Sequence, residues 1–375
     1  GLTWSKPQTT GLVAPESCPA IVAVPNSNAQ IVIWNNSEYD PSWATHYGKR
    51  TPLTMAISRD GLQTFSDFFD IENPEYVILA AAHVGGIMAN NVYRADFIYN
   101  NLQIQQNVIG ESFRHNVKKL LFLGSTCIYP CNCAQPMSED VLLTSALEYT
   151  NEPYAIAKIA GLKMCESFNL QYGTNYIAVM PTNLYGPNDN FDLEKSHVLP
   201  AMIRKIHLAK CLKEGDWEAI KLDFNKRPVE GVSGESEKKD ILSILSKHGV
   251  SEKGVELWGS GKPLREFLWS EEMADASVFI MEHVDFKDIK NHEKEIRNCH
   301  INIGTGKEIS IKDLAYLIAN EIGYDGTICF NSNKPDGTMR KLTDVTKLHS
   351  LGWKHKIDIE EGVSKLYKWY SMRSC

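Results

Sequence analysis

Short apolar runs alternate with longer amphipathic stretches from residue 76 onward. The runs at 76–80 and 120–123 are apolar on both faces and are followed by small residues, as expected of buried parallel strands. A third run, at 176–180, precedes a proline. Between them, residues 94–115 and 154–172 carry apolar side chains at helical spacing. The order strand, helix, strand, helix, strand predicts an α/β fold with a doubly wound, Rossmann-like parallel sheet.

The first 65 residues follow a different pattern. Residues 21–24 and 30–34 are short strand-like runs separated by a turn-forming segment, which predicts antiparallel β-structure. A nucleotide-binding sheet of the doubly wound kind should instead begin with a strand, a glycine-rich turn and a helix. Neither G-x-x-G-x-x-G nor G-x-G-x-x-G occurs between Gly1 and Gly61. We therefore expect an incomplete Rossmann-like core, preceded by a short, unrelated β-rich segment.

Residues 191–257 change character again and predict a smaller lobe or an insertion. The charged stretch 235–240 precedes the amphipathic run 241–245, and we interpret it as a solvated helix face.

Composition is that of an ordinary globular protein. Of the 375 residues, 43% are hydrophobic and 23% are charged, and the net charge is -7, so the basic excess typical of nucleic-acid binding is absent. No apolar run is long enough to span a membrane, and residues 1–10 lack the layout of a signal peptide. These features predict a cytoplasmic protein with no nucleic-acid or membrane partner.

The cysteines predict free thiols. Their count, nine, is odd, and a chain of this size does not need disulfides to stabilise it. Cys127, Cys131 and Cys133 form one cluster, but the chain has no second pair at zinc-finger spacing. We therefore expect no metal site.

Tyr154 and Lys158 are four residues apart, so both side chains lie on one helical face. A tyrosine hydroxyl is a poor acid at neutral pH unless a nearby cation favours the phenolate, and Lys158 can supply that cation. Ser125 follows the run at 120–123, where ligands of open α/β sheets bind. Chance alone often places Tyr and Lys four apart, but together these three residues resemble the triad of short-chain dehydrogenases/reductases.

Cys127 and His197 are a candidate acid–base pair. In an extended backbone, Cys127 would point to the same side as Ser125, two residues earlier. The ordinary pKa values of a thiol and an imidazole suit the removal and return of protons beside a ketone. For either residue alone, a buried thiol or a surface imidazole is the commoner interpretation.

Several segments resemble GDP-L-fucose synthases, and the resemblance covers residues 66–375 in the family's order. It rests on the segments 124–130, 151–158, 180–187, 196–200, 258–267 and 334–338. Members of that family use NADPH to convert GDP-4-keto-6-deoxy-D-mannose to GDP-L-fucose. They epimerise the two carbons that flank the ketone and then reduce it.

The resemblance implies a role for each matching residue. Cys127 and His197 would be the base and acid of epimerisation, Tyr154 the proton donor for reduction, Lys158 the residue that holds the nicotinamide ribose and lowers the tyrosine pKa, and Ser125 the residue that orients the keto oxygen. The implied NADPH-binding residues are Leu123, Gly124, Ser125, Thr126, Lys158, Pro181, Thr182, Asn183, Leu184 and His197. The implied GDP-sugar-binding residues are Lys205, which stands where an arginine is common, Trp258, Arg265 and Asp336. A homodimer is also expected.

The resemblance implies three parts: a β-rich segment at 1–65, an NAD(P)-binding core at 66–190 and a substrate-binding lobe at 191–375, with part of 265–305 returning to the core. The resemblance to the family does not extend to the N-terminal segment, where the glycine-rich turn is expected. Residues 50–65 there instead resemble a strand and Asp-box of a sialidase-type propeller blade. One blade cannot close a propeller, so we expect no glycosidase activity.

Two other interpretations remain open at this stage. A nucleotide-sugar dehydratase or simple epimerase could share the fold, although dehydratases usually carry an acidic residue where this chain has Thr126 and Cys127. Alternatively, the chain could be a non-catalytic remnant, because a missing pyrophosphate turn leaves phosphate hydrogen bonds unmade.

Overall fold

The structure is a computed structural model that describes residues 20–23, 30–35, 53–58, 66–70, 75–194, 196–290, 295–334 and 336–372. The chain divides into two compact units. The first comprises Gly1–Val77 with Ser112–Lys118, and the second comprises Ile78–Glu111 with Lys119–Cys375. The three-part division predicted from the sequence, with boundaries at 65/66 and 190/191, stays a prediction.

Four strands of the first unit form an antiparallel sheet in the order β1-β2-β3-β4. They are β1 (Ala20–Ala23), β2 (Gln30–Asn35), β3 (Leu53–Ser58) and β4 (Ser66–Asp70). The predicted antiparallel pairing of the first two runs is confirmed. Most of the predicted Asp-box, at 59–65, lies outside the described residues.

The central sheet has the order β13-β7-β6-β5. Its strands are β5 (Tyr76–Leu79), β6 (Lys119–Leu123), β7 (Tyr176–Pro181) and β13 (His300–Ile303). The pairs β6–β7 and β7–β13 are parallel. All three apolar runs predicted as strands are therefore strands, and the fold is α/β with an incomplete Rossmann-like sheet.

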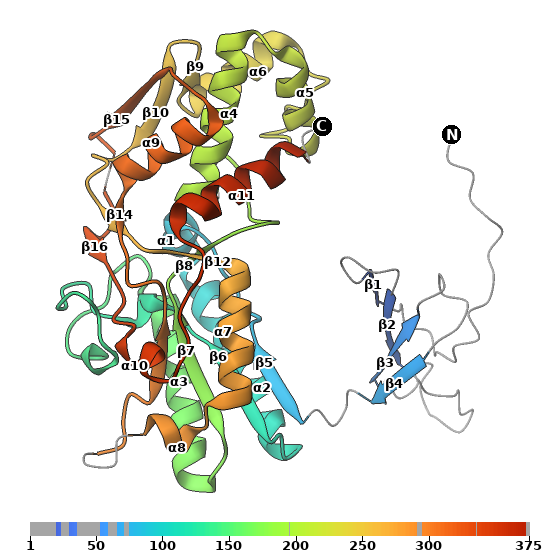
Figure 1. Ribbon diagram of the computed structural model, residues 1–375, viewed down its shortest axis with the longest axis vertical. Helices are drawn as coiled ribbons and strands as arrows, with labels where there is room; N and C mark the ends of the chain where they lie inside the picture. Colours follow the sequence, from blue (N-terminus) through green and yellow to red (C-terminus); the bar gives the residue numbers. More distant parts are fainter. Residues whose placement is uncertain are drawn as a thin grey trace. The chain divides into compact units, whose positions relative to one another are not determined.

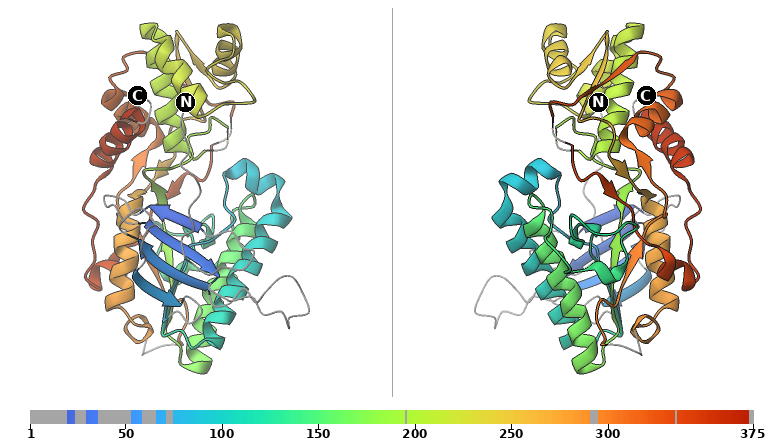
Figure 2. Two further views of the ribbon diagram at one scale, coloured as in Figure 1. Left: turned by 90° about the vertical axis from the view of Figure 1, so that its right-hand side faces the viewer. Right: turned by 90° about the vertical axis from the view of Figure 1, so that its left-hand side faces the viewer.

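Helices cover both faces of this sheet (Figures 1 and 2). Helices α2 (Arg94–Arg114) and α3 (Glu152–Tyr172) lie on one face, and α7 (Ser270–His283) lies on the other. Helix α3 approaches closely because Gly161 has no side chain: a Cβ there would stand 2.4 Å from Cζ of Phe122. On the opposite face, apolar side chains of β6, β7 and β13 pack against those of α7.

The sequence-based expectation that the run at 76–80 is buried was wrong. Tyr76 is 58% exposed and Ile78 is 48% exposed. Strand β5 is an edge strand of the central sheet. The four strands that precede it in the sequence pair with one another in a separate antiparallel sheet. A strand at an edge lacks the second neighbour that would help to cover its side chains.

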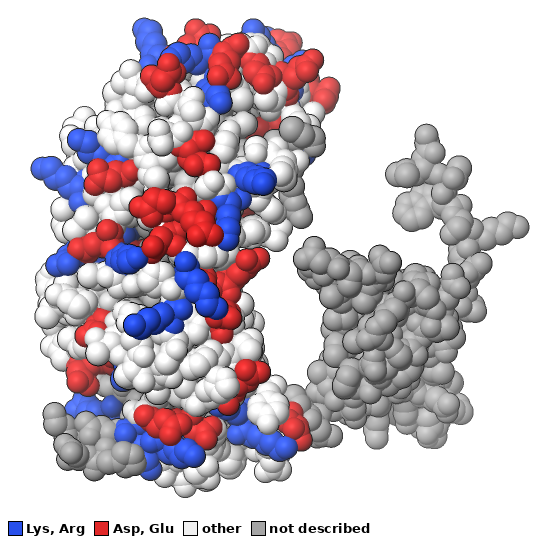
Figure 3. Space-filling model, viewed as in Figure 1, with Lys and Arg blue, Asp and Glu red and all other residues white. Residues whose placement is uncertain are grey.

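Helices and a small sheet of order β15-β10-β9 build the lobe around a second core. Its main elements are α4 (Val198–Glu214), α5 (Trp217–Lys226), α6 (Lys238–Lys247), β9 (Val250–Ser251), β10 (Gly254–Trp258), α9 (Ile311–Ile322), β15 (Thr327–Asn331) and α11 (Ile359–Met372). Most of the charged run 235–240 is exposed at the start of α6, as predicted. On the described face in Figure 3, charges of both signs are interspersed.

Short elements connect the lobe to the central sheet. Strand β12 (Phe267–Trp269) pairs in parallel with β8 (Asn183–Tyr185), and α7 and β13 then complete the core. The remaining elements are α1 (Ile87–Val92), η1 (Thr126–Ile128), η2 (Glu139–Val141), β11 (Leu264–Arg265), α8 (Phe286–Ile289), β14 (Ile309–Ser310), β16 (Arg340–Lys341) and α10 (Thr346–Ser350). No helix in the described ranges is long and apolar enough to cross a membrane.

Candidate active site

Ser125 and Cys127 lie just beyond the carboxyl end of β6. The sequence-based expectation of an extended backbone at Cys127 was wrong. Residues Thr126–Ile128 form a single 3-10 turn that begins after Ser125. The hydroxyl of Ser125 caps this turn and accepts a hydrogen bond from the Cys127 amide at 3.2 Å. The turn therefore fixes the serine and the cysteine relative to each other.

Tyr154 lies in the first turn of α3, next to both of these residues. Burial raises the pKa of Tyr154, the nearby Cys127 side chain raises it further, and a hydrogen bond with the Ser125 side chain opposes the shift. The ring of Phe97 packs edge-on against the Tyr154 ring, with centroids 6.4 Å apart. The phenol is therefore protonated at neutral pH and able to donate a proton.

Lys158, one turn further along α3, is only 3% exposed. Its ammonium group donates a hydrogen bond to the carbonyl of Leu123 at 2.8 Å and lies 5.8 Å from the centroid of the Tyr154 ring. Burial lowers the pKa of Lys158 to about 8. The hydrogen bond to Leu123 holds the lysine at the end of β6. The implied lowering of the tyrosine pKa by Lys158 stays a prediction, because the pKa of Tyr154 is raised and Lys158 is not a cause of that shift.

His197 is the residue before the first turn of α4, and its side chain is exposed. Burial raises the pKa of nearby Asp189, while its hydrogen bond from the Asn190 amide and the charge of His197 oppose that shift. Within the described residues, contacts join Ser125, Cys127, Tyr154 and Lys158, and none joins His197 to that group. The pairing of His197 with Cys127 stays a prediction.

The ends of β6 and β7 lie side by side, with Leu123 opposite Val179 in a parallel pair. The amide of Gly124 donates to the Val179 carbonyl at 2.8 Å, and a Cβ at Gly124 would stand 2.3 Å from Sδ of Met180. A larger residue at this position would have to displace the end of the Met180 side chain. The amide of Thr182 donates to the Ile303 carbonyl at 2.9 Å, which anchors the end of β7 to β13.

Arg265 and Asp336 lie close enough to interact. Burial lowers the pKa of Arg265, and the negative charge of Asp336 opposes that shift. A carboxylate oxygen of Asp336 accepts a hydrogen bond from the Ser260 amide at 2.8 Å. Gly259 has a φ of 83° and a Cβ there would stand 2.4 Å from that oxygen, so only glycine fits.

Trp258 and Lys205 occupy contrasting environments. Trp258 is 59% exposed and so is not a core residue, and the ammonium group of Lys334 lies 5.1 Å from the centroid of its ring. Lys205, on α4, is buried, and this burial lowers its pKa to about 8 although the charge of Glu256 opposes the shift.

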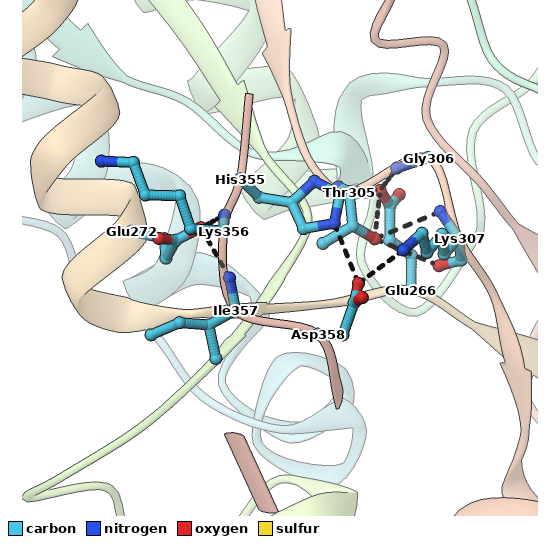
Figure 4. Close-up of polar contacts among 9 residues, drawn as sticks. All are labelled: Glu266, Glu272, Thr305, Gly306, Lys307, His355, Lys356, Ile357 and Asp358. Carbon is cyan, nitrogen blue, oxygen red and sulfur yellow. Dashed lines mark hydrogen bonds and ion pairs between the residues drawn. The ribbon is translucent and has the colours of Figure 1, made fainter. Parts of the chain in front are cut away.

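Glu266, which the sequence reasoning did not select, organises the backbone around these residues. It is fully buried, and one carboxylate oxygen accepts hydrogen bonds from the amides of Thr305 at 2.6 Å and Gly306 at 2.7 Å (Figure 4). The other oxygen accepts from the amide of Thr343 at 2.9 Å and from its hydroxyl at 2.6 Å. Glu266 thus connects the residues after β13 and β16 to the strand that carries Arg265. Glu266 lies within the segment 258–267, which carries the family resemblance, and this position was the sequence signal that could have identified it.

Within the described part of the chain, no group of three or more His, Cys, Asp or Glu side chains is arranged to hold a metal ion. Cys131 and Cys133 are free thiols. Cys127 has a different environment, because the ammonium group of Lys341 lies 3.7 Å from its sulfur atom.

Comparisons with known proteins agree with this geometry. The sequence profile of the NAD dependent epimerase/dehydratase family matches residues 20–222 and 228–304. The chain belongs to this family. It is 47% identical over 304 residues to the GDP-L-fucose synthase of Escherichia coli (strain K12), an alignment that covers 81% of this chain and 82% of that protein.

Two solved structures are also similar to this chain. A GDP-6-OMe-4-keto-L-xylo-heptose reductase from C. jejuni is 47% identical with a TM-score of 0.74, and the match covers 80% of this chain and 83% of that one. The GDP-mannoheptose C4 reductase MlghC from Campylobacter jejuni, solved with NADP bound, is 46% identical with a TM-score of 0.70 and the same coverage.

The family match begins at residue 20 and so includes part of the segment predicted to be unrelated. The described strands of that segment nevertheless form an antiparallel sheet rather than a strand, turn and helix. The resemblance of residues 50–65 to a sialidase-type blade stays a prediction.

Proposed function

We propose that this protein is a GDP-L-fucose synthase that uses NADPH to epimerise and reduce GDP-4-keto-6-deoxy-D-mannose. One observation carries the proposal: Ser125, Cys127, Tyr154 and Lys158 lie together at the carboxyl end of β6. The similarity to the GDP-L-fucose synthase of E. coli supports the same reaction. This placement favours an enzyme over a non-catalytic remnant or a dehydratase.

The first step is epimerisation. A ketone acidifies the C–H bonds beside it, so the thiolate of Cys127 can take a proton from a flanking carbon and leave an enolate. Hydrogen bonds from Ser125 and Tyr154 stabilise the negative oxygen of that enolate. His197 in its protonated form then delivers a proton to the opposite face of the carbon, which inverts it. Solvent returns both side chains to their starting protonation states.

The second step is reduction, in which NADPH supplies the hydride when it is bound. The ends of β6 and β7 fit the nicotinamide half of this cofactor, because the Gly124 amide joins the two strand ends and Lys158 is hydrogen-bonded at the end of β6. Tyr154 donates its phenolic proton to the oxygen of the former ketone. Lys158 stabilises the tyrosinate that remains, and Asn183 and Thr182 would line the same edge of the sheet.

The GDP group of the substrate would bind along the lobe. Arg265 can form a bidentate contact with a phosphate, whereas Lys205 would act as a point charge. The exposed ring of Trp258 offers an apolar surface, and Asp336, held by the Ser260 amide, can accept hydrogen bonds from the substrate.

The test is to incubate the chain with GDP-4-keto-6-deoxy-D-mannose in D₂O and follow the sugar by NMR. We expect deuterium at the two carbons beside the ketone without NADPH, and GDP-L-fucose after NADPH is added at millimolar concentration. If deuterium does not enter the sugar and NADPH is not consumed, the proposal is wrong.

A second candidate is a GDP-heptose 4-keto reductase. The two C. jejuni reductases are as similar to this chain as the E. coli synthase is. Comparing kcat/KM for the 6-deoxyhexose and heptose substrates separates the two candidates. A preference of tenfold or more for the heptose would replace the proposed substrate.

We also propose a cytoplasmic homodimer. Helices α2 and α3 present large exposed apolar side chains, including Tyr99, Leu170 and Tyr172, which a second copy of the chain would cover. Seven cysteines in the described part of the chain are free thiols, which fits a reducing compartment. Sedimentation velocity tests the dimer, and cell fractionation tests the location.

A further inference from the structure

Lys341 stands beside the sulfur of Cys127, although 214 positions separate the two residues in the sequence. Its Nζ lies 3.7 Å from Sγ, a distance at which a cation stabilises a thiolate relative to a thiol. The lysine was not selected as a site residue from the sequence.

The backbone holds Lys341 in place from both sides. It is the last residue of β16, where it pairs with Arg265 of β11. The next residue, Leu342, donates its amide hydrogen to the side chain of Gln135 at 2.9 Å and accepts a hydrogen bond from the Met137 amide at 2.7 Å. Thr343 is held by the buried carboxylate of Glu266. Such anchoring fixes the base of the lysine side chain against the loop that follows Cys127.

Other ionisable groups face this pair. The phenol of Tyr154 interacts with Cys127, and the charge of Lys341 also reaches Cys133 and Glu148. Although burial opposes it, hydrogen bonds from Thr150 and Asn151 lower the pKa of Glu148, and Lys341 lowers it further. The carboxylate of Glu148 is already hydrogen-bonded by Thr150 and Asn151, so it does not compete with Cys127 for the ammonium group of Lys341.

We propose that Lys341 is a positioning residue that favours the thiolate of Cys127 and thereby makes this cysteine a competent base for epimerisation. The assignment of the base rests on the proposed function, but the effect of Lys341 on the thiol does not. The lysine exchanges no proton in the reaction. It stabilises the negative sulfur before the proton is removed, and the neutral thiol remains when the enolate forms.

The test measures the pH dependence of alkylation of Cys127 by iodoacetamide, read by peptide mass spectrometry in the full chain. In Lys341→Met, we expect the alkylation midpoint of Cys127 to rise by about one to two pH units. Lys341→Arg should restore most of the shift because it keeps the charge. The exposed Cys329 provides an internal reference in every sample, and Lys365→Met, on the surface of α11, is the matched control variant.

Deuterium exchange into the keto sugar provides the second readout. At pH 7, the exchange rate of Lys341→Met should fall about tenfold or more, in proportion to the thiolate lost. An unchanged Cys127 midpoint with a raised KM would overturn the proposal and make Lys341 a substrate-binding residue. Circular dichroism checks that the variants are folded. If the midpoint shifts but the wild-type chain exchanges no deuterium, the proposed epimerisation fails while the effect of Lys341 stands.

Discussion

At the scale of single residues, the two proposed proton transfers would use different side chains around one serine hydroxyl. Ser125 interacts with the Tyr154 side chain and with the amide of Cys127. A thiolate and a phenol beside the same ketone can therefore act in sequence without moving the substrate between sites.

The Tyr154→Phe variant should lose reduction and keep exchange. Removal of the general acid should lower the rate of NADPH oxidation by about a hundredfold or more. Deuterium incorporation beside the ketone should fall but stay measurable, because Cys127 remains as the base and Ser125 can still donate a hydrogen bond to the enolate oxygen. Complete loss of both activities would contradict the assignment of proton transfer by Tyr154 to the reduction step alone.

The Cys127→Ser variant should show the reverse pattern, because a hydroxyl is a far weaker base than a thiolate at neutral pH. We expect deuterium incorporation to be suppressed and some hydride transfer to survive, giving a deoxy sugar of unchanged configuration that NMR can detect. Cys131→Ser and Cys133→Ser are the controls and should behave as wild type. Full exchange in Cys127→Ser would place the base elsewhere.

The lowered pKa of Lys158 predicts a pH limit for reduction. Its ammonium form is present below about pH 8 and is lost as the pH rises through that value. Since the cation supports the tyrosinate that forms on proton donation, kcat should fall above about pH 8 at saturating NADPH. Lys158→Arg should move the fall to higher pH, since a guanidinium group keeps its charge.

At the scale of elements, a single buried carboxylate connects three strand ends. Glu266 lies between β11 and β12 and accepts hydrogen bonds from the residues that follow β13 and β16. Strand β16 carries Lys341 and β11 carries Arg265, so the geometry of both side chains depends on this connection.

Replacing Glu266 with glutamine should be destabilising. The amide would direct N–H donors at backbone N–H groups, which leaves buried donors unpaired and costs about 2 to 4 kcal/mol of the free energy of unfolding. Urea denaturation measures the loss. Glu321→Gln, on the exposed surface of α9, should change the free energy of unfolding by less than about 0.5 kcal/mol. A similar stability for both variants would contradict the connecting role.

At the scale of the whole molecule, the sequence combines the proposed catalytic residues with a segment, Gly1 to Gly61, that has no glycine-rich dinucleotide motif. The glycine-rich turn normally donates several hydrogen bonds to the pyrophosphate at a helix N-terminus. Its absence between Gly1 and Gly61 should weaken cofactor binding more than it affects epimerisation.

NADPH should therefore bind poorly to the 375-residue chain. Loss of three charge-assisted hydrogen bonds at ~1.5 kcal/mol each weakens affinity more than a thousandfold. Calorimetry should give a Kd well above the micromolar range, and a variant in which a full strand–GxxGxxG–helix unit replaces residues 1–65 should bind much more tightly. Micromolar binding by the unaltered chain would contradict this prediction.

The sequence by itself determined three strands and two helices of the core and the antiparallel pairing of the first two strands, and it singled out Ser125, Tyr154 and Lys158 as candidates. The elements and the Tyr154–Lys158 spacing depend on patterns within short windows, where local geometry follows from neighbouring residues. Only the tertiary structure decided that β5 is an exposed edge, that a 3-10 turn holds Cys127 and that Lys341 and Glu266 support the site. These contacts join residues far apart in the chain, so they depend on how whole elements pack.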